Sequence, residues 1–357
     1  MINSKLQIER FPFNGDPNLK AWNAADELLV SVFQDIRQQE VAVFGDRFGY
    51  LTLQLQEFHP NTVINYKSQL AALTYNASKC GISPNRQPSD ILEPLKTAVW
   101  QSGIIHIPKS NDLFEVYIKY FVMHAQQEAV LLCGFMTRHF TPAWLDMLSV
   151  YFDDVSQTKA VKKARVLICR SIRRRPEEIL KMTFYEYHGR SYGQYPGVFS
   201  KSHIDAATAF LLEHLIPEKE EYDLLDIGCG NGIIGISLKN RFPWVNVSGT
   251  DDSILAVASA RNNDESCDWQ WNYNLEHYDN ESFDIIVSNP PFHLEYETDP
   301  SLAWNLLQQS AYKLRRDGRM LVVFNRHLNY STQLIKWFSN CRKLAENEKF
   351  SILECRK

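Results

Sequence analysis

The sequence predicts an α/β fold with a mostly parallel sheet, and three stretches carry this prediction. Residues 224–235 read as a short apolar run, a glycine-rich turn and the start of a helix. Residues 245–251 and 285–292 are two further apolar runs, and each ends in polar residues. Strands alternating with helices in this way are typical of a doubly wound sheet, which binds ligands at the carboxyl ends of its strands.

The turn after the first run carries glycine at every second position: Gly228, Gly230 and Gly232. Glycine is needed where the backbone adopts positive φ or where a ligand lies against the main chain. Asp251, nineteen residues past Gly232, ends the next run. A carboxylate at that strand tip suits a ribose diol. Taken alone, the turn is equally compatible with a purely structural role.

The most specific motif is Asn289-Pro290-Pro291-Phe292 at the end of the third run. Two consecutive prolines fix φ, remove two backbone donors and hold the preceding Asn289 extended. The amide oxygen and nearby carbonyls then suit an exocyclic amine, and Phe292 offers a surface on which a base can stack. The alternative is a proline-rich loop that merely ends a strand.

These motifs together resemble the class I S-adenosylmethionine-dependent methyltransferases, and specifically the branch that methylates amino groups on planar rings. Residues 196–200, 289–293 and 325–328 resemble the ribosomal RNA guanine-N2 methyltransferases. The opening residues 10–12 and 21–26 resemble the branch that modifies large-subunit (23S) RNA. The resemblance covers nearly the whole chain.

The resemblance implies a seven-stranded, mostly parallel sheet and S-adenosylmethionine as cofactor. Its expected cofactor-binding residues are Asp226, Gly228, Gly230, Gly232, Asp251, Asp252, Asn274 and Asn289. Its expected catalytic residues are Asn289, Pro290 and Phe292, with Phe292, His293 and Arg326 also facing substrate RNA. Asn272 is the alternative to Asn274 for contact with adenine, and either could be a turn residue.

An internal duplication is inferred from residues 41–51, which repeat the strand and turn. Gly45 falls at Gly228 and Gly49 at Gly232, whereas Val43 replaces Asp226 and Arg47 replaces Gly230. At the other two motifs, Ile107 is matched to Asn289, and no carboxylate occurs between Val63 and Cys80. We therefore expect two tandem methyltransferase-like domains: 1–175, degenerate and used for RNA recognition, and 176–357, catalytic. The alternative is that two unrelated sheets share a periodicity.

The remaining elements follow in order. Residues 185–192 are expected to begin a β-hairpin, and residues 204–215 a helix with Asp205 near its start. There the chain departs from the family pattern, with His203 and Ala207 where relatives carry glycine. Asp205 could therefore serve only as a helix cap. The remaining expected elements are helices at 253–262 and 302–314 and strands at 269–271, 320–324 and 350–353, the last one antiparallel.

Composition limits the functional classes. With 357 residues and a net charge of −4, the chain is not a generally basic nucleic-acid binder. Its longest apolar run, 129–136, is too short to span a bilayer, and its opening residues are unlike a signal peptide. Seven cysteines without a CxxC pair argue against a disulfide framework or a zinc site. We expect a cytoplasmic, metal-free monomer with reduced thiols.

Positive charge is concentrated between residues 159 and 176, where no acidic residue occurs. The basic residues are Lys159, Lys162, Lys163, Arg165, Arg170, Arg173, Arg174 and Arg175. A solvated face is one interpretation. The other is a phosphate-contacting patch, with Arg173, Arg174 and Arg175 as substrate-RNA residues.

The predicted reaction is methyl transfer to the N2 amine of a guanine in 23S RNA. Three alternatives stay open at this point: the same reaction on 16S RNA, the same chemistry on adenine N6 or a protein glutamine, and a non-catalytic RNA-binding protein.

Overall fold

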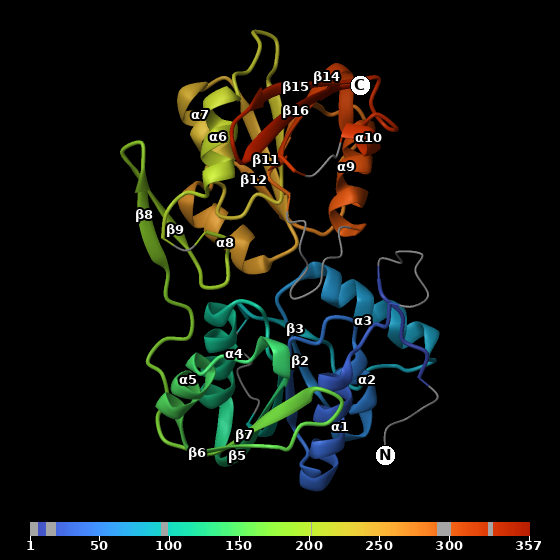
Figure 1. Ribbon diagram of the computed structural model, residues 1–357, viewed down its shortest axis with the longest axis vertical. Coiled ribbons are helices and arrows are strands. Elements are labelled where there is room, and N and C mark those ends of the chain that lie inside the picture. The colour runs from blue at the N-terminus through green and yellow to red at the C-terminus, as the bar shows by residue number, and fades with distance from the viewer. Residues whose placement is uncertain (1–5, 12–18, 94–98, 201, 291–300, 328–330) are drawn as a thin grey trace. The chain divides into compact units, whose positions relative to one another are not determined.

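The computed structural model describes residues 6–11, 19–93, 99–200, 202–290, 301–327 and 331–357. The chain divides into two compact units, Met1–Lys181 and Met182–Lys357, each built on its own sheet (Figure 1). The expected boundary after Arg175 lies a few residues before this division. Among the described residues, no helix has the length and apolarity needed to cross a membrane.

The sheet of the first unit has the strand order β3-β2-β1-β4-β5-β7-β6. Only β7 runs against its neighbours. The strands are β1 Val41–Phe44, β2 Asn61–Ile64, β3 Ser89–Asp90, β4 Trp100–His106, β5 Ala125–Met136, β6 Phe152–Gln157 and β7 Ala164–Ile172. The helices are α1 Ala24–Ile36, α2 Tyr50–Gln54, α3 Lys67–Lys79, α4 Asn111–His124 and α5 Ala143–Tyr151, with short 3₁₀ turns at Gln56–Phe58 and Thr137–His139.

The second unit repeats this topology in the order β12-β11-β10-β13-β14-β16-β15, with β16 antiparallel. Its strands are β10 Asp223–Ile227, β11 Asn246–Asp251, β12 Asp268–Trp271, β13 Phe283–Ser288, β14 Leu314–Asn325, β15 Asn340–Glu346 and β16 Phe350–Arg356. A hairpin of β8 Thr183–Tyr187 and β9 Arg190–Gln194 precedes it. Its helices are α6 Ala206–His214, α7 Ile233–Arg241, α8 Ile254–Asn263, α9 Ser301–Lys313 and α10 Ser331–Leu334. The expected fold class, two tandem seven-stranded α/β units, is confirmed.

Alternation along the buried strands distributes side chains between two cores. In β10, Leu224 packs in the cluster that includes Leu211 of α6 and Ile234 of α7. The next residue, Leu225, packs in the cluster that includes Leu307 of α9. Because successive strand residues point to opposite faces, both faces of the sheet are covered by helices.

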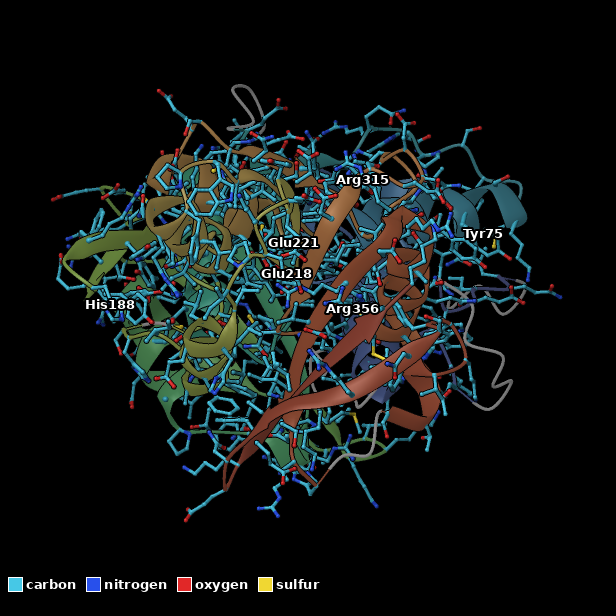
Figure 2. All side chains as sticks on the ribbon, turned by 90° about the horizontal axis from the view of Figure 1, so that it is seen from above. Tyr75, His188, Glu218, Glu221, Arg315 and Arg356 are labelled. Atoms are coloured by element: carbon cyan, nitrogen blue, oxygen red, sulfur yellow. A yellow bond between two sulfur atoms is a disulfide. The ribbon has the colours of Figure 1, made fainter. Side chains whose placement is uncertain are left out.

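Ion pairs hold together the edge of the second sheet at which its parallel strands begin. Arg319 lies 2.7 Å from Glu221. Arg356 lies 2.7 Å from Glu218, and Figure 2 labels both of these residues. Arg319 is almost fully buried, and its ion pairs with Glu221 and, at 2.9 Å, with Glu354 satisfy a charge that would otherwise be costly to bury. This amino edge is structural, which leaves the opposite, carboxyl edge for function.

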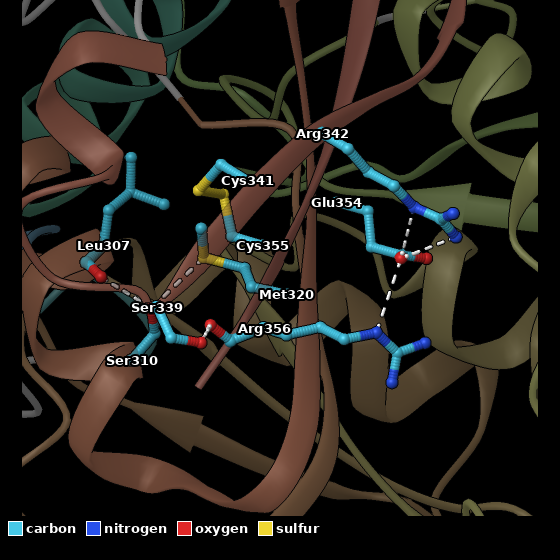
Figure 3. The surroundings of a disulfide bond; sticks show 9 residues. All are labelled: Leu307, Ser310, Met320, Ser339, Cys341, Arg342, Glu354, Cys355 and Arg356. Carbon is cyan, nitrogen blue, oxygen red and sulfur yellow. Dashed lines mark hydrogen bonds and ion pairs between the residues drawn. A yellow bond between two sulfur atoms is a disulfide. The ribbon is translucent and has the colours of Figure 1, made fainter.

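One expectation about the cysteines is wrong: the structure contains a disulfide between Cys341 and Cys355 (Figure 3). The two residues lie directly opposite each other on β15 and β16, with Cα atoms 4.1 Å apart. Antiparallel pairing brings such positions close enough to be bridged. Neither spacing nor the odd cysteine count reveals this, because the contact depends on strand register. The other described cysteines are free.

Candidate active site

The glycine-rich turn begins where β10 ends. Gly228, Gly230 and Gly232 have φ of 70°, 56° and 82°, a region that favours glycine. A Cβ atom added to Gly230 would meet nothing within 4 Å, so open space lies against the main chain here. Gly232 is the N-cap of α7 and lacks a capping side chain. The turn therefore offers a cradle and free helical amides to a ligand.

Asp251, at the end of β11, closes one side of this cradle. Its Oδ2 accepts a hydrogen bond from the Gly230 amide at 2.9 Å, and its Oδ1 accepts one from the Ser253 amide at 2.8 Å. Desolvation raises the pKa of Asp251 to about 6, against the effect of both hydrogen bonds. The turn and the acid predicted from separate motifs thus form one constellation. Direct contact of either with a cofactor stays a prediction.

Asp226, unlike the partly exposed Asp251, is fully buried. Its Oδ2 accepts a hydrogen bond from the Gly235 amide at 3.3 Å, and its Oδ1 has no partner among the described residues. Burial, together with the nearby charge of Asp251, raises the pKa of Asp226 to about 7. An unsatisfied buried carboxylate oxygen beside an open turn fits a polar ligand group.

Asn289 follows β13, the strand paired with β10. Its Nδ2 donates to the Asp205 carboxylate at 3.0 Å and to the Thr208 hydroxyl at 2.9 Å. A carboxylate accepts and does not donate at neutral pH, so the amide orientation is determined. Both hydrogens of the amide nitrogen are used. Any further polar partner of this side chain must therefore donate to Oδ1.

Asp205 connects this amide to α6. It is the N-cap residue, and its Oδ2 also accepts hydrogen bonds from the Ala207 and Thr208 amides at 3.0 and 3.1 Å. The capping role expected from the sequence is present. The link to Asn289, 84 residues away, was missed because only the fold brings the two side chains together.

Other predicted positions are less informative. Asn272 follows β12 directly, whereas the Asn274 side chain accepts from the Glu276 amide at 3.3 Å, as in a turn. The carbonyl of Asp252 accepts from the Trp271 indole at 2.8 Å. Pro290 is buried beside Asn289. Phe292 and His293 lie outside the described residues. All of these remain predictions as ligand contacts.

The predicted RNA-facing arginines lie at different edges of the sheets. Arg326 lines an open depression with Asn325, His327 and residues 348–350, next to the tip of β14. Arg173 follows β7 at the amino edge, where its Nε lies 2.6 Å from Asp153. Arg175 donates to the backbone carbonyls of Val122 and Ala125, the second at 2.8 Å. Arg174 is exposed, and its contact with RNA stays a prediction.

The first unit carries the same turn without its open space. Gly45 and Gly49 have φ of 71° and 85°, close to Gly228 and Gly232. Arg47, in place of Gly230, lies with its guanidinium carbon 5.5 Å from the ring centre of Tyr66. Strand pairing places Ile64 in the position of Asp251. This copy therefore lacks the cradle, as its degenerate sequence predicts.

Two details of the duplication differ from the sequence alignment. Strand pairing places His106, not Ile107, in the position of Asn289, and His106 is bonded to Asp26 of α1 at 2.6 Å. The match to Ile107 was a misalignment by one residue: His106 follows Gly45 by 61 residues, as Asn289 follows Gly228, so the spacing agrees with the strand pairing. Also, the carboxylate of Asp46 bonds the Thr52 amide at 2.8 Å, the bond that Asp226 makes in the second unit. Each unit therefore has a carboxylate bonded to the helix that follows the turn, but the two carboxylates come from different sequence positions.

The donor set suits S-adenosylmethionine: a glycine cradle, a carboxylate at the next strand tip and an orphaned buried oxygen. Within the described part of the chain, no three histidine, cysteine, aspartate or glutamate side chains are grouped as metal ligands.

Comparisons with known proteins agree with this division. Residues 1–173 match the RLMG N-terminal domain, and residues 191–354 match the methyltransferase small domain. Among solved structures, the chain is similar to the T. thermophilus 16S rRNA N2 G1207 methyltransferase (RsmC), solved with AdoMet and guanosine. That match has a TM-score of 0.77 at 19% identity and covers 96% of this chain and 94% of the other. A TehB-like methyltransferase from Corynebacterium glutamicum matches at 20% identity over 44% of this chain and 90% of its own, with a TM-score of 0.33.

The two family models cover nearly all of the chain, each on one unit, and the tandem fold agrees with them. The chain belongs to the RsmC/RlmG family of S-adenosylmethionine-dependent methyltransferases.

Proposed function

We propose that the protein transfers a methyl group from S-adenosylmethionine to the exocyclic N2 amine of a guanine in 23S ribosomal RNA. The observation that carries this proposal is the fixed amide of Asn289 at the carboxyl edge that also holds the glycine turn. A single acceptor oxygen, rigidly presented, suits an amine that must be held by its hydrogens while its lone pair reacts.

Bound S-adenosylmethionine supplies an activated methyl group on a sulfonium, so the protein's contribution is chiefly alignment and exclusion of water. The amine of guanine is a poor nucleophile because its lone pair is delocalised into the ring. Asn289 Oδ1 accepts one amine hydrogen, which favours the pyramidal, reactive geometry. No strong base is required, because the proton leaves after transfer. The guanine must be unpaired or extruded to reach the site.

The 23S assignment rests on the resemblance of residues 10–12 and 21–26 to the large-subunit branch. The second candidate is a guanine of 16S RNA, because the full-length structural match is an enzyme with that substrate. In this proposal the first unit recognises RNA and the second catalyses, in a cytoplasmic monomer that binds one cofactor.

The test is methylation of purified 16S and 23S RNA with labelled S-adenosylmethionine, followed by mass mapping of the modified nucleotide. We expect N2-methylguanine in 23S RNA from the wild type and none from Asn289→Ala. Label in 16S RNA would select the second candidate. Label on adenine or protein, or no label with intact cofactor binding, would overturn the proposal.

A further inference from the structure

Each unit contains the same corner, where the fifth strand of its sheet ends beside the turn that joins the last two strands. In the first unit the Thr137 amide donates to the Lys163 carbonyl at 2.8 Å, and in the second the Arg326 amide donates to the Lys349 carbonyl at 2.8 Å. These bonds are equivalent because the two sheets have the same strand order. We call the two places corner 1 and corner 2.

Both corners present exposed cations. Corner 1 carries Arg138 and Lys163, and corner 2 carries Arg326 and Lys349. An arginine-histidine pair follows the strand in each: Arg138-His139 and Arg326-His327. In corner 2 these side chains line the open depression described above. The cofactor features survive in only one copy, whereas the basic corner occurs in both.

Acidic groups at the corners offset these charges only in part. Glu346 lies 3.5 Å from Arg326, and Glu348 lines the depression. At corner 1, Glu27 pairs with Lys162 at 2.9 Å. Among the described residues, no carboxylate lies within ion-pair distance of Arg138, Lys163 or Lys349, so each corner retains positive charge.

The topology also divides the basic run of residues 159–175. Its beginning lies in the turn of corner 1, at the carboxyl edge, because β7 starts there beside the end of β5. Its end lies at the opposite edge, where Asp153 neutralises Arg173 and where Arg175 satisfies backbone carbonyls. The half of the run at corner 1 is thus better placed to bind anions than Arg173 and Arg175.

We propose that corners 1 and 2 are equivalent binding points for the phosphates of the RNA substrate. This inference rests on the proposed function and names the surface that its substrate uses. Exposed Arg and Lys side chains on an open surface suit a polyanion backbone, which is bound through charge and without base readout. A small anion would require an enclosed site, whereas the depression at corner 2 is open.

The test compares four variants of the full chain. Two change one corner each, Arg138→Gln with Lys163→Gln and Arg326→Gln with Lys349→Gln, and a third combines all four changes. The matched control, Arg37→Gln with Lys219→Gln, removes an exposed cation away from the corners in each unit. Affinity for 23S RNA is measured as a function of salt, and cofactor affinity by calorimetry.

We expect each corner variant to reduce the slope of log affinity against log salt by about 2, and the combined variant by about 4. The control should keep the wild-type slope, and all variants the wild-type cofactor affinity. A combined variant with the wild-type slope would overturn the inference while leaving the function intact. A wild type that neither binds nor methylates RNA would instead overturn the function.

Discussion

The two units build the same turn at the same point of the same sheet, yet only one turn leaves room for a ligand. Gly45 and Gly49 bend the first chain as Gly228 and Gly232 bend the second, with φ values within a few degrees. What separates them is the residue between the two glycines: Gly230 leaves open space beside the main chain, whereas the first unit has Arg47 there, with its guanidinium carbon 5.5 Å from the ring centre of Tyr66. The fold therefore needs only the outer glycines, and for this reason we predict that the middle glycine, Gly230, contacts the cofactor.

The ends of the equivalent strands β4 and β13 also share their geometry and differ in their chemistry. The first unit has His106 bonded to Asp26, and the second has Asn289 bonded to Asp205 and Thr208. Both pairs tie a strand tip to the start of a helix, which stabilises either unit. Only Asn289 leaves an amide oxygen available as an acceptor, whereas His106 has its Nδ1 engaged with Asp26.

The largest expected effect is at the second strand tip. Asn289→Ala should lower kcat by about 10²–10³-fold, as removal of one preorganised polar group typically does, with cofactor affinity unchanged. The matched change in the other unit, His106→Ala, should leave kcat within about threefold. Single-turnover methylation and calorimetry measure both. Equal losses of kcat and cofactor affinity in Asn289→Ala would indicate misfolding.

Two substitutions of Asp205 can separate its role in positioning the Asn289 amide from its role as a helix cap. Asp205→Ser keeps a good N-cap residue but is too short to hold the Asn289 amide, whereas Asp205→Asn keeps an oxygen at the same reach. We expect kcat to fall by about 10- to 100-fold in the serine variant and to recover largely in the asparagine variant. KM for RNA and thermal stability should change little. Equal activity of the two variants would restrict Asp205 to capping.

The cofactor site itself is tested at Asp251. Asp251→Asn should weaken S-adenosylmethionine binding about 10- to 100-fold, the effect of losing charged hydrogen bonds. Because its pKa is raised to about 6, wild-type affinity should be constant above pH 7 and fall as pH drops below 6. Calorimetry should show one site per chain. Two sites, or an affinity independent of Asp251, would contradict the division between the copies.

Much of this arrangement could be predicted from the sequence, because the glycine turn, the strand-tip acid and the Asn289 motif are local patterns. Contacts that depend on register or on distant elements could not. The match of Ile107 to Asn289 was only a misalignment by one residue, since the spacing from the equivalent glycines already gives His106. In contrast, no local pattern shows that Asp46 takes the place of Asp226 from a different position. The Cys341–Cys355 disulfide has the same cause.

The smallest expected effect is on thermal stability, and it distinguishes the two buried carboxylates, Asp226 and Asp46. Asp226 receives one long hydrogen bond, and its raised pKa of about 7 means that it is ionised in the folded protein only above neutral pH. There the fold holds a desolvated charge that the unfolded chain leaves in water, so ionisation destabilises the fold. Asp226→Asn removes that charge. The unfolded chain ionises this group from about pH 4, so the cost accumulates between about pH 4 and pH 7 and is complete above it. We expect Tm of the cofactor-free protein to rise by roughly 2–4 °C at pH 8, the shift that about 1 kcal/mol produces, and this gain to shrink as pH falls from 7 and to vanish near pH 4.

Asp46 gives the opposite expectation, although burial raises its pKa to about 6. Its two oxygens accept from the Leu51 amide at 3.2 Å and from the Thr52 amide and hydroxyl at 2.8 and 2.6 Å. One amide oxygen cannot replace both acceptors, and the new amide nitrogen would face a backbone donor. Asp46→Asn should therefore lower Tm at pH 8, where Asp226→Asn raises it. If thermal denaturation shows the same response at both positions, the orphaned oxygen of Asp226 is not held ready for a ligand, and the two carboxylates are structural equivalents.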